Sequence, residues 1–152
     1  MLAPKFWYPE NNEISFSSLA LVPFGHIYSL LSKFRMSKTV KKQFDIPIVC
    51  IGNLNVGGTG KTPTTISAAQ FLRDRKYNVH IVSRGYGGNA MGPLSVNDKE
   101  LSANDVGDEA LMLSAFAPTW VANNRSDGIQ SAIKEGADII LLDDGFQDPS
   151  VY

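Results

Sequence analysis

The chain has 152 residues, of which 43% are hydrophobic and 19% are charged, with 13 glycines and one cysteine. This balance is typical of a globular protein of about one domain, and it excludes a disordered, collagen-like or coiled-coil chain. Because Cys50 is the only cysteine, an internal disulfide is excluded and the cytoplasm is the expected compartment.

Charge is distributed unevenly along the sequence. Residues 1–44 contain six basic and two acidic residues, a net charge of +4, whereas residues 45–152 carry a net charge of −5. We therefore predict two parts, a basic N-terminal arm over 1–44 and an acidic domain over 45–152. A basic arm of this kind favours an anionic partner.

The first predicted element is an amphipathic helix from Phe16 to Phe34. Apolar side chains recur there every three or four residues, which is the spacing of one helix face. They are Phe16, Leu19, Ala20, Phe24, Ile27, Leu30, Leu31 and Phe34. Pro23, Gly25 and His26 interrupt the run, so it is unsuited to crossing a bilayer, which takes about 20 consecutive apolar residues. The segment 1–8 lacks the basic lead and unbroken apolar core of a signal peptide.

Five cations overlap and follow the end of this helix: Lys33, Arg35, Lys38, Lys41 and Lys42. Beside an apolar face they indicate a helix that lies on a membrane surface, where each cation gains up to about 1 kcal/mol from anionic lipid. The alternative is a helix that packs on the protein's own core and leaves its cations in water. The pattern alone leaves both interpretations open.

The second predicted element is a buried strand over 46–53 (IPIVCIGN), which leads into a glycine-rich loop over 55–62 (NVGGTGKT). The loop matches the phosphate-binding pattern G-x-x-x-x-G-K-[ST] except that Asn55 occupies the first glycine position. A helix is predicted directly after it, with Pro63 in its first turn, so that its N-terminus faces the phosphates. The alternative is a glycine-rich turn that binds nothing.

In the functional interpretation, the loop binds a nucleoside triphosphate together with Mg²⁺. Backbone N–H groups converge on the phosphate oxygens, Lys61 places a positive charge on the β and γ phosphates, and the Thr62 hydroxyl binds the metal ion. The predicted nucleotide-binding residues are Asn55, Val56, Gly57, Gly58, Thr59, Gly60, Lys61 and Thr62.

A second strand is predicted over 78–83, followed by Arg84 and the glycine-rich segment 85–88 (GYGG). Ligands bind beyond the carboxyl ends of strands in open α/β sheets, so Arg84 is a candidate ligand contact. An ordinary turn with a surface arginine is the alternative. Residues 89–106 contain few apolar side chains and no helical period, and we expect a loop or a small hairpin there.

A further helix is predicted to begin at Asp108 and Glu109, before the apolar run 110–117. One of the two acids can serve as a general base or bind Mg²⁺, whereas the structural alternative makes Asp108 the N-cap of the helix. A third strand is expected over 119–122 and a helix over 125–135. Asn124 and Arg125 then also follow the carboxyl end of a strand.

The last predicted strand, over 137–142 (ADIILL), is followed by Asp143 and Asp144. In P-loop proteins an acid at this place orients the Mg²⁺ that bridges the phosphates, the Walker B arrangement, although two acids after a strand can also form a turn. The elements together predict an α/β fold, a P-loop NTPase-like and mostly parallel sheet flanked by helices. His26 and His80 are expected to pack or to lie on the surface, and no cysteine or histidine spacing indicates zinc.

Four motifs occur in order along the chain: IGNLNVGGTGKTP (51–63), SRGYGG (83–88), VGDEALML (106–113) and LLDDGFQ (141–147). Together they resemble the tetraacyldisaccharide 4'-kinase family, the lipid A 4'-kinases of Gram-negative bacteria. The segment FWY (6–8) and the helix after it are similar to the membrane-associating N-terminal helix of that family. Members are about twice this length, and Asp148 stands where they usually have His. We therefore expect this chain to be the N-terminal portion of such a kinase.

The resemblance implies ATP-dependent phosphorylation of the 4'-hydroxyl of a tetraacylated disaccharide 1-phosphate, at the cytoplasmic face of the inner membrane. It implies that Lys61 and Thr62 bind ATP and Mg²⁺ and that Asp108 is the base that takes the hydroxyl proton. Glu109, Asp143 and Asp144 then organise the metal ion and the phosphates, and Arg84, Asn124 and Arg125 are candidates for binding the substrate. The expected partners are the lipid disaccharide and the anionic membrane surface, with no nucleic acid and a monomeric chain.

Two other classes of protein compete with the kinase. A nucleotide switch or metallochaperone-like ATPase or GTPase shares the glycine-rich loop, but the sequence has no N-K-x-D-type motif for reading guanine. A membrane-binding module without catalysis requires a vestigial loop, which the intact Lys61 and Thr62 argue against. Phosphate transfer to lipid, as opposed to hydrolysis that needs no lipid, separates the first two classes.

Overall fold

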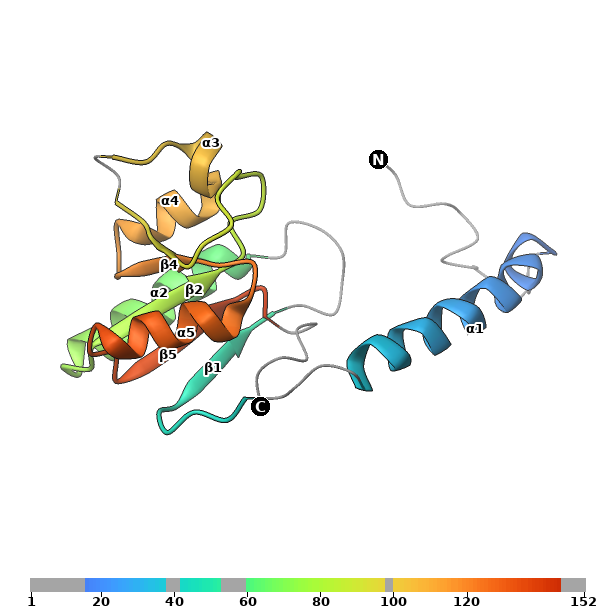
Figure 1. The fold of residues 1–152 in the computed structure, drawn as a ribbon, viewed down its shortest axis with the longest axis horizontal. Helices are drawn as coiled ribbons and strands as arrows, with labels where there is room; N and C mark the ends of the chain where they lie inside the picture. Colours follow the sequence, from blue (N-terminus) through green and yellow to red (C-terminus); the bar gives the residue numbers. More distant parts are fainter. Residues whose placement is uncertain (1–15, 38–41, 53–59, 98–99, 146–152) are drawn as a thin grey trace. The chain divides into compact units, whose positions relative to one another are not determined.

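A computed structural model describes residues 16–37, 42–52, 60–97 and 100–145. The chain divides into two units, Met1–Val40 and Lys41–Tyr152, and each is described by itself. The first unit contains one helix and the second contains an α/β sheet domain (Figure 1).

Helix α1 spans Phe16–Ser37, so the helix predicted over 16–34 is present and continues for three more residues. It passes through Pro23, which lacks the N–H that a helix interior normally uses. Its large apolar side chains are half or more exposed: Leu19, Leu21, Val22, Phe24, Ile27, Tyr28, Leu30, Leu31 and Phe34. Leu21, Val22 and Tyr28 lie outside the predicted face, so the apolar surface is broader than the sequence period indicated. Within the described residues, no helix is long and apolar enough to cross a membrane.

The second unit is built on a five-stranded sheet in the order β1-β5-β2-β4-β3 (Figure 1). The strands are β1 (Ile48–Ile51), β2 (Val79–Ser83), β3 (Leu94–Ser95), β4 (Thr119–Val121) and β5 (Ile139–Asp143). The first four in sheet order run parallel, and β3 runs antiparallel to β4. The α/β fold with a mostly parallel sheet is therefore confirmed.

Helices cover both faces of this sheet. Helices α2 (Lys61–Asp74) and α4 (Asp108–Ser114) pack on one face and α5 (Arg125–Lys134) packs on the other (Figure 1). Alternate residues of one strand serve the two cores, because successive side chains of a strand point to opposite faces. Thus Ile81 of β2 packs with α2 and α4, and Val82 packs with α5.

The carboxyl ends of the three strands that matter for the site meet at one edge of the sheet. In the pairing register, Ile51 of β1 lies beside Asp143 of β5, and Val82 of β2 lies beside Leu142. Helix α2 begins ten residues after strand β1 ends, and helix α5 begins four residues after strand β4 ends. The loops that follow these strands therefore open on the same side, as ligand sites in α/β sheets require.

The segment 89–106 differs from its prediction as a loop or small hairpin. It contains strand β3 and a four-residue helix, α3 (Ala103–Val106), which starts with a reciprocal cap between Ser102 and Asp105. Buried Val96 and Val106 anchor the segment on Val121. Four residues are too few to show a helical period, so the sequence pattern missed this helix.

Candidate functional site

The first feature of the site is an ion pair between the start of α2 and the end of β5. Lys61 Nζ donates to Asp144 Oδ1 at 2.6 Å. This contact raises the pKa of Lys61, mainly through the hydrogen bond to Asp144, with further contributions from the charges of Asp143 and Glu109. The ammonium is therefore held positive at the sheet edge where the strands end.

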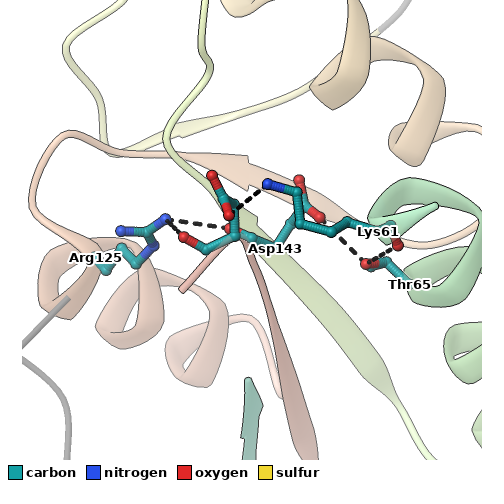
Figure 2. Close-up of polar contacts among 5 residues, drawn as sticks. Lys61, Thr65, Arg125 and Asp143 are labelled. Atoms are coloured by element: carbon teal, nitrogen blue, oxygen red, sulfur yellow. Dashed lines mark hydrogen bonds and ion pairs between the residues drawn. The ribbon is translucent and has the colours of Figure 1, made fainter. Parts of the chain in front are cut away.

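The second feature is the buried carboxylate of Asp143, the last residue of β5. Its side chain is buried, and Oδ1 accepts a hydrogen bond from the Thr65 hydroxyl at 3.2 Å (Figure 2). Burial raises the pKa of Asp143, while the Thr65 hydrogen bond acts in the opposite direction. The same hydroxyl lies 3.1 Å from the Lys61 carbonyl oxygen, so Thr65 joins the first turn of α2 to the acid.

Thr65 was not among the predicted site residues. A signal was available, because it lies four residues after Lys61 and therefore one helical turn further along the same face of α2. A threonine in a helix interior, however, usually satisfies its hydroxyl on the preceding turn, which leaves the sequence without a reason to single it out.

Arg125 has a different environment from the ligand contact that the sequence predicted. The residue is 2% exposed, and its Nη2 donates to the main-chain carbonyls of Asp143, at 3.2 Å, and Asp144, at 2.7 Å. Figure 2 shows Asp143 between Arg125 on one side and Lys61 and Thr65 on the other. Arg125 thus binds the backbone at the end of β5 and is itself buried.

The acidic pair that opens α4 faces water. Asp108 and Glu109 are both exposed and form the first turn of the helix, and the N-cap is Gly107. The alternative that made Asp108 the N-cap is therefore wrong by one residue. The negative charge of Glu109 raises the pKa of both Lys61 and Asp143, which places this carboxylate within electrostatic reach of the sheet edge.

The glycine-rich segment after β2 packs tightly against the start of α4. A Cβ on Gly88 would lie 2.5 Å from the carbonyl oxygen of Asp105 and 2.7 Å from the amide nitrogen of Gly107. Backbone packing therefore requires a glycine at position 88, whatever else the segment does. Arg84, directly before them, is exposed at the carboxyl end of β2, where the sequence placed it.

Asn124 is exposed at the end of β4 and caps α5. Its Oδ1 accepts from the Ser126 amide at 3.2 Å, and its Nδ2 donates to Asp127 at 2.9 Å. This cap satisfies one of the free N–H groups at the helix start. It also fixes the first turn of α5, in which Arg125 lies.

Part of the predicted phosphate loop, residues 55–59, lies outside the described residues, as does Asp148. What is described begins at Gly60, the N-cap of α2, with φ of 77°. A glycine adopts this left-handed conformation without the cost that a side chain adds. The partial positive charge of the α2 N-terminus adds to that of Lys61, so this end of the helix favours an anion.

The oxygen donors at the sheet edge fit Mg²⁺ in a phosphate site. Mg²⁺ prefers hard oxygen ligands and is held by one or two carboxylates plus phosphate oxygens and waters. Thr62, Asp143 and Asp144 supply a hydroxyl and two carboxylates at the ends of α2 and β5. In the described ranges, no group of three or more His, Cys, Asp or Glu side chains forms a metal cluster by itself.

Comparison with known proteins decides the family. A family model described as tetraacyldisaccharide-1-P 4'-kinase matches residues 17–152. The chain belongs to this kinase family. Among curated relatives, the tetraacyldisaccharide 4'-kinase of Parvibaculum lavamentivorans is 43% identical over 152 residues, and that of a Jannaschia species is 46% identical over 151 residues. Each alignment covers 99% of this chain but 44% and 45% of the relative, so the chain spans less than half the length of these kinases.

The kinase family also has a matching solved structure. LpxK from Aquifex aeolicus, crystallised in complex with ATP, superposes with a TM-score of 0.74 at 30% sequence identity. The match covers 88% of this chain and 45% of that one. The resemblance that the four sequence motifs indicated is therefore confirmed at the level of family and fold.

Proposed function

We propose that this chain is the nucleotide-binding part of a kinase that transfers phosphate from ATP to the 4'-hydroxyl of tetraacyldisaccharide 1-phosphate in lipid A biosynthesis. The observation that carries the proposal is the ion pair of Lys61 with Asp144, which joins the end of the glycine-rich loop to the end of β5. Membership of the kinase family and the ATP complex of its Aquifex relative support it.

ATP would bind along residues 55–62, with its phosphates at the N-terminus of α2. Lys61 would neutralise the β and γ phosphates, and it reaches them by leaving Asp144 for a stronger anion. When bound, Mg²⁺ would supply charge neutralisation of the phosphates, held by Thr62, Asp143 and Asp144. Thr65 keeps the Asp143 carboxylate oriented toward α2 throughout.

The acceptor hydroxyl would be activated at the start of α4. In this proposal Asp108 takes the proton of the 4'-hydroxyl, and Glu109 contributes to the metal and phosphate environment. Phosphoryl transfer depends mainly on alignment and on stabilising charge, so one acid near the acceptor completes the set. Arg84 and Asn124, both exposed at strand ends, are the side chains proposed to contact the substrate.

The proposal is tested by following the transfer of labelled phosphate from ATP to the lipid disaccharide, using the full-length polypeptide that the gene encodes. Lys61→Ala should abolish transfer. Lys134→Ala, which removes an exposed lysine from the last turn of α5, is the matched control and should leave transfer unchanged. ATP hydrolysis that needs no lipid and gives no labelled lipid would instead favour a nucleotide switch.

We also propose that α1 holds the kinase on the anionic cytoplasmic surface of the inner membrane. Its exposed apolar side chains and the cations at residues 33–42 support this role. In flotation with vesicles that contain anionic lipid, the intact chain should float, and the triple variant Phe24→Gln, Ile27→Gln, Leu31→Gln should remain at the bottom. Equal flotation of the two proteins would reject the proposal.

A further inference from the structure

Arg125 is a buried cation, and two of its contacts are with main-chain carbonyl oxygens. Moving a guanidinium out of water is costly unless its donors are satisfied by good acceptors. Nη2 carries two N–H groups, and it directs them at the adjacent carbonyls of Asp143 and Asp144. Arginine suits this arrangement because its planar group holds donors in a fixed geometry.

The stretch of backbone that Arg125 grips has an unfavourable conformation. Asp144 has φ of 52°, in the left-handed region, which costs roughly 1 kcal/mol for a residue with a side chain. At this φ the chain turns sharply as it leaves β5, and the Asp144 carboxylate faces Lys61. The free-energy cost of this backbone strain must be offset by a favourable contact. The charge-assisted hydrogen bond that Arg125 donates to the Asp144 carbonyl, at 2.7 Å, is strong enough to offset it.

The two sides of Asp144 are therefore held by different partners. Arg125, from the first turn of α5, binds the main chain, and Lys61, from the first turn of α2, binds the side chain. A nucleotide that draws Lys61 away from the Asp144 carboxylate would therefore leave the hydrogen bonds of Arg125 to the main chain in place.

We propose that Arg125 is a positioning residue, which fixes the main chain at Asp143 and Asp144 so that their carboxylates point to the metal and phosphate site. The inference rests on the proposed function for what the acids do, and it replaces the prediction that Arg125 contacts the substrate. In this role Arg125 acts through the two aspartates.

The first test reads the backbone without any ligand. In the 152-residue chain, the three-bond HN–Hα coupling of Asp144 and the carbonyl ¹³C shifts of Asp143 and Asp144 are measured by NMR. Arg125→Lys and Arg125→Gln should move all three signals. Arg73→Lys is the matched control, since Arg73 also donates to a main-chain carbonyl, that of Phe116, but on another part of the surface. It should leave the three signals in place.

The second test separates metal binding from nucleotide binding. ATP affinity is measured by calorimetry with and without Mg²⁺. Arg125→Lys should reduce the Mg²⁺-dependent gain in affinity about 10-fold, which is typical for groups that orient metal ligands, and change metal-free binding less than about twofold. In the Asp144→Asn background the same substitution should have little further effect.

The outcomes are distinguishable. If the wild-type chain binds no ATP, the proposed function fails, and the NMR result alone decides whether Arg125 sets the backbone. If Arg125→Lys retains the Asp144 coupling, or keeps the full Mg²⁺-dependent gain while the wild type binds Mg²⁺ and ATP, the positioning role is overturned. Arg125→Lys preserves the charge, so it remains informative where Arg125→Gln fails to fold.

Discussion

Lys61 Nζ lies 2.6 Å from Asp144 Oδ1, although 83 residues separate them in the sequence. The pair links the first turn of α2 to the end of β5. In P-loop proteins these two places carry the residues that bind phosphate and metal ions. Because the two side chains are 28% and 61% exposed, the pair contributes little to folding, about 0–1 kcal/mol. In the proposed nucleotide site its main consequence would concern binding, since a phosphate and Asp144 would compete for the Lys61 ammonium group.

Removing the competitor should therefore change nucleotide binding in two directions. In Asp144→Asn, metal-free ATP should bind several-fold more tightly, because Lys61 is released and a negative charge is removed from the site. The gain in affinity from added Mg²⁺ should fall, because one carboxylate ligand is lost. Calorimetry with and without Mg²⁺ measures both. Unchanged metal-free binding would contradict the competition.

Asp143 should weaken the fold at neutral pH. Burial raises its pKa in the folded state, so the folded protein gives up the proton less readily than the unfolded chain, and stability falls as the pH rises through the folded pKa. Asp143→Asn should raise Tm at pH 7 by a few degrees, at about 4 °C per kcal/mol for a domain of this size. The difference should vanish as the pH falls well below 3.8, the ordinary pKa of an aspartate, where the acid is protonated in both states. A lower Tm for the variant at pH 7 would refute this account.

Thr65 should stabilise the fold through its hydroxyl. Thr65→Val leaves the buried Asp143 carboxylate without this donor and should cost about 1–3 kcal/mol in urea unfolding at pH 7. Thr65→Ser keeps the donor and removes one methyl group, for which about 1 kcal/mol is expected. In the Asp143→Asn background the cost of Thr65→Val should shrink. Equal costs in both backgrounds would show that the hydrogen bond does not carry the effect.

His80 should make the fold sensitive to mild acid. It is buried on β2, and its Nδ1 accepts from Trp120 Nε1 at 3.2 Å, so the neutral ring carries its proton on Nε2. Burial lowers the pKa of His80, although Glu135 and Asp138 partly offset the effect. The stability that depends on the neutral ring is present above pH 6.5 and is lost as the pH falls toward the folded pKa. His80→Gln should therefore lose less stability than the wild type between pH 7.5 and 5, measured by urea unfolding at each pH.

The glycine-rich segment after β2 offers a matched pair of substitutions. Gly88→Ala forces a Cβ against the backbone of residues 105–107 and should cost about 1–3 kcal/mol. Gly87 has φ of 84° but open space around it, so Gly87→Ala should pay mainly the backbone strain, roughly 1 kcal/mol. Thermal unfolding should rank Gly88→Ala as the less stable variant, and the reverse order would refute the packing argument.

Strands β2 and β5 could be predicted because buried strands carry largely apolar runs, and both are buried. Strand β1 was located in the same way, but the prediction that it is buried was wrong, because it lies at the edge of the sheet and leaves Val49 and Cys50 exposed. The run that ends at Leu142 also located Asp143 and Asp144 correctly at a strand end. The difference in environment between the two acids was not visible. One remains within the strand and is buried, whereas the other turns out of it and is exposed, and that depends on where the last ladder partner lies.

The parts that the sequence did not predict depend on contacts between distant segments. Arg125 follows a strand, at a position typical of ligand contacts. The residues next to it in the sequence do not indicate that its side chain binds the main chain at the end of β5. Thr65 presents the same difficulty, because its partner is 78 residues away. The cap of α3 was visible as Ser102 followed three residues later by Asp105, but so short a helix has no period to confirm it.

The strand order has a consequence for how the domain is made. β5 is the last of the described strands to be synthesised, yet it lies between β1 and β2. During synthesis β2 can pair with β4 before β5 is made, whereas β1 has no strand partner in the described sheet until β5 has emerged. The insertion of β5 between β1 and β2 also brings Asp144 to Lys61, and long-range pairing of this kind is slow to form. Until then, β1 leaves its backbone N–H and C=O groups open to pairing with another strand.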